Sequence, residues 1–216
     1  MEWAKRQVAG RIEKTLLEKI KLGIPLSGQE VEQICLEGLA DPDRQRDEAA
    51  DVGSGVHEEI ESYLTEYDRP EISEFSEPVR RFADAWNRSG LTVVGTEIPV
   101  VWYDNEGNGF GGRLDILAYK DEKFYIGDNK TSRSVHNSYG VQIGSYAAAV
   151  EQMSKGAIKI AGGYIFHIPT LETLNDRQKK EYDKRGSLIE VRNLEDAFGY
   201  YRLLLGLYNK RNNKYF

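Results

Sequence analysis

Two short apolar runs, each carrying an aspartate near one end, constrain the fold of this chain more than any other stretch. The runs are GGRLDILAY (residues 111–119) and KFYIGDNK (residues 123–130), and both have the length and composition of strands. Asp121 and Glu122 lie near the middle of a connection that is short enough for a hairpin. We therefore predict that the two runs pair as antiparallel strands.

The hairpin register predicts two acidic side chains facing each other. Asp115 is expected directly opposite Asp128, with Arg113 opposite Lys130 on the same sheet face. Like charges in a cross-strand pair are destabilising and raise the pKa of one carboxyl group, so a positive charge must lie between them. Two interpretations stay open: a structural ion-pair cluster, or a site for Mg²⁺ or Mn²⁺ with a lysine beside it, since carboxylates are hard oxygen ligands.

The rest of the chain predicts an α/β or α+β fold in one domain, residues 1–216. Residues 1–90 are expected to be mainly helical, and residues 91–216 to hold the sheet and a C-terminal helix. Apolar spacing predicts helices within residues 2–21, 27–39, 43–68, 75–88, 138–153 and after 193, and further strands within 91–103, 157–168 and 187–193. The polar stretch 170–186 is expected to be a surface excursion.

Composition excludes several classes of protein. The net charge of −6 means that the overall field repels nucleic acid, so such a partner would need a local basic patch or bound metal ions. The single cysteine, Cys35, excludes an internal disulfide, a Cys-rich zinc site and an iron–sulfur cluster held by this chain alone. No run approaches the roughly 20 apolar residues of a membrane span, and the N-terminus lacks a signal sequence, so a cytoplasmic protein without a membrane partner is expected.

Five short motifs follow one another between about residues 53 and 150. They are His57 in GSGVHEEIESYL, Glu97 in TEIPV, Asp115 in GGRLDIL, Asp128-Asn129-Lys130 in YIGDNKTS, and Gln142 with Tyr146 in QIGSY. This order resembles the PD-(D/E)XK nuclease superfamily, and most of all its RecB-like exonuclease branch, which includes mitochondrial genome maintenance exonucleases and CRISPR adaptation nucleases. The resemblance implies a restriction-endonuclease-like core, with a central mixed sheet flanked by helices and a helical N-terminal elaboration.

The resemblance also implies a metal centre. Asp115 and Asp128 would bind Mg²⁺ or Mn²⁺ through their carboxylates, and the carbonyl of Asn129 would add a ligand. Lys130 would position the attacking water. His57 is expected as a further ligand because of its G-x-x-x-H context, although a lone histidine on a helix is more often a surface or core residue.

Glu97 has two competing interpretations. In the resembling family an acid at this place contributes to the catalytic site. Alternatively, Glu97 is a charge on an edge strand that opposes aggregation, and Pro99 two residues later is typical of such an edge. Neither interpretation is favoured by the sequence.

Substrate contacts are expected from the helix and the loop that follow the lysine. Gln142 and Tyr146 are four residues apart, hence on one helix face, and line the groove in the resembling family; the alternative is an amphipathic helix with two polar surface residues. Trp102 and Tyr139 are candidate platforms for stacking unpaired bases, although each such residue is more often part of the core or the surface. Further candidate phosphate contacts are Arg113, Thr131, Ser132 and Arg133.

These features together predict a metal-dependent deoxyribonuclease that acts on DNA ends or single strands in recombination, repair or replication. Recombination or replication proteins are candidate partners, and the small size would suit a phage or mobile-element enzyme. Three alternatives stay open. They are a structure-specific or restriction-like endonuclease, a non-catalytic nucleic-acid-binding module, and a structural protein with a coincidental charged hairpin.

Overall fold

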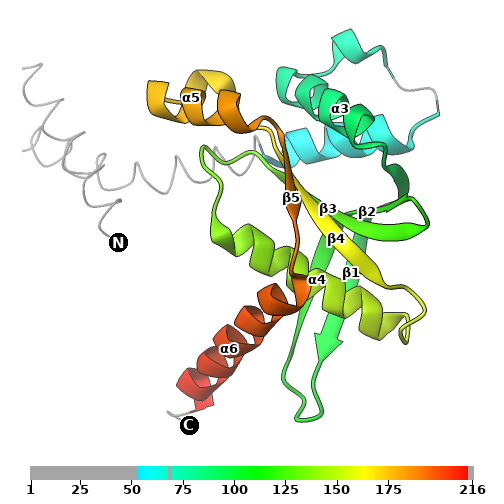
Figure 1. Ribbon diagram of the computed structural model, residues 1–216, viewed down its shortest axis with the longest axis vertical. Helices are drawn as coiled ribbons and strands as arrows, with labels where there is room; N and C mark the ends of the chain where they lie inside the picture. The colour runs from blue at the N-terminus through cyan, green and yellow to red at the C-terminus, as the bar shows by residue number, and fades with distance from the viewer. Residues whose placement is uncertain (1–52, 68–69, 214–216) are drawn as a thin grey trace, which may run out of the picture. The chain divides into compact units, whose positions relative to one another are not determined.

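The computed structural model describes residues 53–67 and 70–213, and a five-stranded mixed sheet lies at its centre (Figure 1). The strands are β1 (Thr92–Tyr103), β2 (Gly109–Lys120), β3 (Lys123–Lys130), β4 (Ile160–His167) and β5 (Leu188–Val191). They lie side by side in chain order, with β3 and β4 parallel and every other neighbouring pair antiparallel. The predicted α/β class, a central mixed sheet flanked by helices, is therefore confirmed.

Helices precede, interrupt and follow the sheet. They are a helix over residues 53–65, the 3-10 helix η1 (Ile72–Glu74), α3 (Glu77–Ser89), α4 (Asn137–Met153), the 3-10 helix η2 (Leu171–Thr173), α5 (Asp176–Arg185) and α6 (Leu194–Asn213). The helices predicted before residue 53, and Cys35 with them, lie outside the described residues. Chain contacts separate Met1–Gly55 from a compact unit, Val56–Phe216, to which the sheet and its helices belong.

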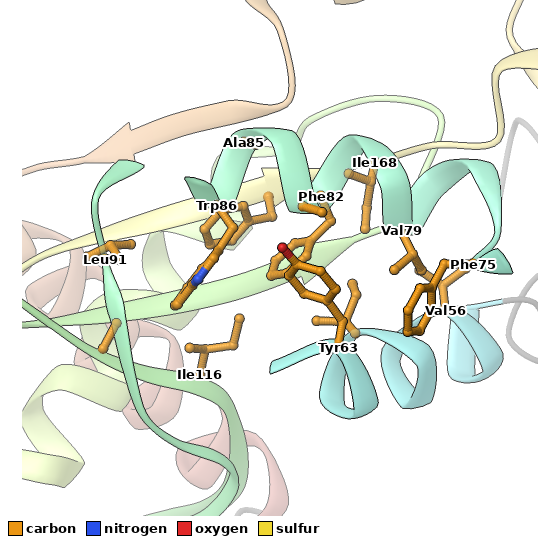
Figure 2. Close-up of a cluster of buried hydrophobic side chains, with 14 residues drawn as sticks. Val56, Tyr63, Phe75, Val79, Phe82, Ala85, Trp86, Leu91, Ile116 and Ile168 are labelled. Atoms are coloured by element: carbon orange, nitrogen blue, oxygen red, sulfur yellow. The ribbon is translucent and has the colours of Figure 1, made fainter. Parts of the chain in front are cut away.

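One face of the sheet is covered by α3 and the helix over residues 53–65. Apolar residues at three- and four-residue spacing on α3, including Val79, Phe82 and Trp86, point toward the helix over residues 53–65 and the sheet (Figure 2). The ring of Phe82 lies 4.8 Å from that of Phe166 on β4. Gly90 ends α3 with φ 67, a left-handed conformation that costs glycine little.

The other face is covered by α4, which α6 covers in turn (Figure 1). Ile143 of α4 packs with Leu114, Ile126 and Ile165 from three neighbouring strands. At Gly144 the two helices come so close that an added Cβ would lie 2.7 Å from the Cβ of Ala197. The middle of β2 and the C-terminal end of β3 thus lie between α4 and the helix over residues 53–65.

Residues 170–186, expected to form a surface excursion, are mostly exposed, and part of the segment is helical. The segment contains η2 and α5, which begins after Asn175, whose side chain accepts from the backbone N–H of Gln178. Tyr182 is buried, and its hydroxyl shares a hydrogen bond of 2.5 Å with the hydroxyl of Ser187. The charge run conceals a helix because only this one aromatic side chain faces the protein interior.

Among the helices of residues 53–67 and 70–213, none has the length and apolar character needed to cross a membrane.

Candidate metal and catalytic site

The predicted hairpin register is confirmed up to the pair Ile116–Gly127, where the β2–β3 ladder ends. Asp115 and Asp128 do not form the next cross-strand pair, contrary to the prediction. Instead, the backbone N–H of Asn129 donates to Asp115 Oδ2 over 2.7 Å, so a side chain takes the place of a backbone acceptor. The two strands separate here, and β3 continues in its pairing with β4.

The predicted facing pair of Arg113 and Lys130 is also wrong. Arg113 pairs with Pro99 on β1, and its guanidinium lies 3.5 Å from the carboxylate of Glu97. The prediction assumed strict alternation along β2. In the structure Leu114 and Leu117 both pack into the cluster under α4, so the alternation breaks between them, next to the acid.

Three potential metal-binding side chains converge where the strands separate. The ligand atoms of His57, Glu97 and Asp115 all lie within 4.8 Å of one another. His57 Nε2 lies 3.2 Å from the carbonyl oxygen of Asn129, which can only accept, so Nε2 carries the proton. Nδ1 is then left without a proton, and it lies 3.8 Å from Asp115 Oδ2.

The electrostatics of this group favour a cation. Burial, and then the charge of Lys130, lower the pKa of His57, so the ring is neutral at pH 7. Burial raises the pKa of Asp115 to about 6, which still leaves the carboxylate ionised at pH 7. A lone pair on Nδ1 and a carboxylate oxygen face each other in this state, and a divalent cation between them would satisfy both.

Asp128 adds a second buried acid beside the group. Its side chain is 1 % exposed, and burial raises its pKa. Lys130 Nζ lies 2.7 Å from Oδ2, close enough for an ion pair, yet neither carboxylate oxygen accepts a hydrogen bond of regular geometry. The side-chain oxygen of Asn129 is likewise buried without a partner. Carboxylate oxygens left unsatisfied beside a histidine fit the oxygen-rich coordination of Mg²⁺ or Mn²⁺.

Glu97 reaches the site through an unusual backbone. Its φ is 50, in the left-handed region that glutamate rarely adopts, and β1 also carries a bulge between Val93 and Gly95. Its neighbour Thr96 donates to the carboxylate of Glu61, on the helix over residues 53–65, over 3.1 Å. β1 is the edge of the sheet, as Pro99 predicted, so Glu97 is an edge residue that turns toward His57 and Asp115.

The predicted substrate residues fall into two places. Gln142 donates to the hydroxyl of Tyr146 over 3.1 Å on one face of α4, and the Tyr146 ring packs directly over Gly112 of β2. Thr131, Ser132 and Arg133 lie in the connection between β3 and α4. Of these three, Ser132 accepts from the hydroxyl of Tyr139 over 2.8 Å and donates to the next turn of the loop, so its hydroxyl serves the loop itself.

The two proposed stacking platforms have other contacts. Trp102 stacks on Phe110 and meets the edge of Phe198, so it contributes to the packing beneath α6. The ring of Tyr139 lies under Lys130 Nζ, 5.1 Å away. Tyr139 therefore holds the lysine by a cation–π contact.

His167 was not singled out from the sequence, yet it anchors the connection after the lysine. It is 1 % exposed, its Nε2 donates to the carbonyl oxygen of Ser132 over 2.8 Å, and Arg185 donates to its Nδ1 over 3.0 Å. Burial lowers its pKa. A histidine at a strand end gives no distinctive signal, because its partners come from a distant loop and from α5.

A comparison with known protein families gives one match. A sequence profile of the PD-(D/E)XK nuclease superfamily matches residues 38–198, about three quarters of the chain and every residue of the site described above. No curated protein matches the chain significantly. Membership in this superfamily implies a nuclease, and the cluster of a histidine and two acids fits the divalent metal that such nucleases use. The chain belongs to the PD-(D/E)XK nuclease superfamily.

Proposed function

We propose that this protein is a metal-dependent deoxyribonuclease of RecB-like type that hydrolyses phosphodiester bonds at DNA ends or in single strands. The observation that carries the proposal is the convergence of His57, Glu97 and Asp115 beside the buried carboxylate of Asp128. These four side chains would hold Mg²⁺ or Mn²⁺, with the carbonyl of Asn129 as a further candidate ligand. A bound cation would supply Lewis-acid stabilisation of phosphoryl oxygens and of the leaving oxyanion.

The protein's own groups divide the remaining work. Lys130, held between Asp128 and the ring of Tyr139, places a positive charge where it can orient the attacking water and offset negative charge on a phosphorane-like transition state. Arg113 is 69 % exposed beside Glu97 and can bind a neighbouring phosphate, together with Thr131 and Arg133.

The preference for ends or single strands rests on the pair Gln142 and Tyr146. The two side chains are joined by a hydrogen bond on the α4 face next to β2. This chain resembles the RecB-like exonuclease branch in having a Q-x-x-x-Y motif after its acid-x-lysine motif. A tyrosine and an amide along a groove can hold a flexible strand by stacking and hydrogen bonds without reading its sequence.

The test uses end-labelled linear DNA, single- and double-stranded, and the same single strand circularised, each with Mn²⁺ or Mg²⁺. The wild type should degrade linear substrate and lose activity with EDTA. Lys130→Ala and Asp115→Asn should lower the rate by about 100-fold or more. Lys159→Ala, which removes a cation from an exposed pair with Glu151, should leave the rate unchanged.

Other outcomes select other functions. Circular strands cut as fast as linear ones would identify an endonuclease. Folded protein that takes up Mn²⁺ in calorimetry but hydrolyses none of the substrates would identify a binding module. Equal activity in wild type and Lys130→Ala would contradict the assignment of Lys130.

A further inference from the structure

The side chains of β1 stop alternating regularly at Glu97. Thr96 contacts the helix over residues 53–65 on one face of the sheet, whereas Ile98 packs in the cluster under α4 on the other face. Residues two positions apart share a face in a regular strand. The alternation of β1 therefore breaks at Glu97, which lies between these two residues.

β2 breaks its alternation at the facing position. Ile116 packs in the apolar cluster of Figure 2, and Leu114 packs in the cluster under α4. Asp115 lies between them, and the strand pairs on either side place it opposite Glu97. Two acids that face each other across neighbouring strands repel. Contacts elsewhere in the fold must therefore hold the two strands in this irregular arrangement.

The irregularity strains the backbone of β1. Glu97 has φ 50, and a glutamate keeps such a conformation only where the contacts on both sides of it are fixed. After Glu97, apolar packing fixes Ile98 under α4. Before it, the contact is polar, because the hydroxyl of Thr96 donates to Oε1 of Glu61 over 3.1 Å. This hydrogen bond is thus placed to decide the direction in which Glu97 points.

The helix that carries Glu61 also carries His57, one turn earlier on the same face. Nε2 of His57 is bonded to the carbonyl oxygen of Asn129 on β3, while Glu61 is bonded to Thr96 on β1. One helix therefore bridges the two strands on either side of β2. Its apolar side is buried in the cluster of Figure 2, so the helix keeps its place on the sheet without the bond to Thr96.

We propose that Glu61 is a positioning residue for the metal site. By accepting the hydroxyl of Thr96, Glu61 fixes the residue that precedes Glu97. The carboxylate of Glu97 is thereby held within 4.8 Å of the ligand atoms of His57 and Asp115. Glu61 acts on the metal through Glu97 and not as a ligand. The inference rests on the proposed function, because it concerns the cation which that function requires.

The first test measures Mn²⁺ affinity by calorimetry at pH 7, together with the thermal midpoint in EDTA. Thr96→Val removes the hydroxyl and keeps the shape, so it should weaken Mn²⁺ binding by about 10-fold while the thermal midpoint stays close to that of the wild type. Thr96→Ser keeps the hydroxyl and should restore most of the affinity. Thr92→Val makes the same change at an exposed position of β1 and should bind Mn²⁺ as the wild type does.

The second test separates the hydrogen bond of Glu61 from its charge. Glu61→Ala should weaken Mn²⁺ binding as much as Thr96→Val does. Glu61→Gln keeps an acceptor oxygen without the charge, so its affinity should be close to that of the wild type. Glu58→Ala removes an exposed acid from the same helix and is the matched control. If Glu61→Gln binds Mn²⁺ as weakly as Glu61→Ala, the charge of Glu61 is what matters, and the positioning role is overturned.

The third test asks whether the effect passes through Glu97. In a Glu97→Gln background, Thr96→Val should cause no further loss of Mn²⁺ affinity, because the residue that it positions has already been changed. The same loss in both backgrounds would overturn the proposal. A wild type that takes up no Mn²⁺ would contradict the proposed function, and this inference with it. A wild type that binds Mn²⁺ no better than Thr96→Val would overturn only the role of Glu61.

Discussion

At the scale of single residues, the most unusual feature is a carboxylate without regular hydrogen bonds in the interior. Asp128 is 1 % exposed, and the Lys130 ammonium lies 2.7 Å from one of its carboxylate oxygens. A charge buried in this way destabilises the fold unless it is paired or coordinated, because its hydration is lost. Asp115, partly buried nearby, has a backbone N–H as its partner. The two acids are best explained as groups kept for a ligand that carries positive charge.

The raised pKa values predict how the stability of the metal-free protein depends on pH. Burial raises the pKa of Asp115 to about 6 and also raises that of Asp128, whereas both acids titrate near 3.8 when unfolded. Between these values the folded state binds more protons than the unfolded state, so the free energy of unfolding falls as pH rises from about 4 to about 6. We expect a loss on the order of 1–3 kcal/mol in urea titrations with EDTA present.

Asp128→Asn isolates this contribution. The amide has the same shape without the charge, so the metal-free variant should lose less stability than the wild type over the same pH range. Asp183→Asn changes an exposed aspartate on α5 and serves as the matched control. If the wild type and Asp128→Asn show the same pH dependence, burial of the Asp128 charge is not its cause.

His57 gives a second prediction at this scale. If its unprotonated Nδ1 is a ligand, His57→Asn should weaken Mn²⁺ binding by about 10- to 100-fold in calorimetry at pH 7. His136→Asn removes an exposed histidine at the start of α4 and should bind Mn²⁺ as the wild type does. Equal affinity in the two variants would exclude His57 from the metal site.

At the scale of elements, the sequence predicted the regular parts and missed the irregular ones. The hairpin β2–β3 was predicted from two short apolar runs joined by a short turn, and helix α4 was predicted from its apolar spacing. The left-handed φ of Glu97 and the break in alternation beside Asp115 were missed, since no residue type demands either. Both irregularities bring acids to His57. The site was thus predictable by residue identity and not by register, because it lies where the regular geometry fails.

The contact between β2 and α4 predicts a position-specific effect of adding one methyl group. A Cβ at Gly112 would lie 2.8 Å from the Tyr146 ring, whereas at Gly111 the nearest atom would be 3.8 Å away. Gly112→Ala should therefore displace the ring and break its hydrogen bond with Gln142. We expect a several-fold rise in KM for DNA with a small change in thermal midpoint, because the atoms displaced are the free end of a side chain.

Gly111→Ala is the control for this prediction. It should leave both KM and the thermal midpoint close to those of the wild type. A Gly112→Ala variant with unchanged KM would show that Tyr146 does not contact substrate. A large fall in the thermal midpoint would instead show that the ring supports the packing of α4 on the sheet.

At the scale of the whole molecule, an acidic chain that binds DNA needs positive charge concentrated at the site. The net charge is −6, and the acids of the site add to the repulsion of phosphate when no cation is bound. A divalent cation bound at the site would offset the charge of these acids, so that the site would attract phosphate instead of repelling it. The protein is therefore expected to bind DNA weakly with EDTA and more tightly with Ca²⁺. Ca²⁺ is a hard divalent ion that prefers oxygen ligands, as Mg²⁺ does, and it would serve to measure binding without hydrolysis.

The same coupling predicts that metal binding stabilises the entire fold in a pH-dependent way. A ligand at about 100 times its dissociation constant stabilises the state that binds it by about 2.7 kcal/mol. Mn²⁺ should raise the thermal midpoint more at about pH 7.5 than at about pH 5, because protons compete for Asp115 and Asp128 below a pKa of about 6. Asp115→Asn should abolish most of the shift at both pH values. An equal shift in wild type and variant would mean that Mn²⁺ binds elsewhere, and the proposed site would then have to be abandoned.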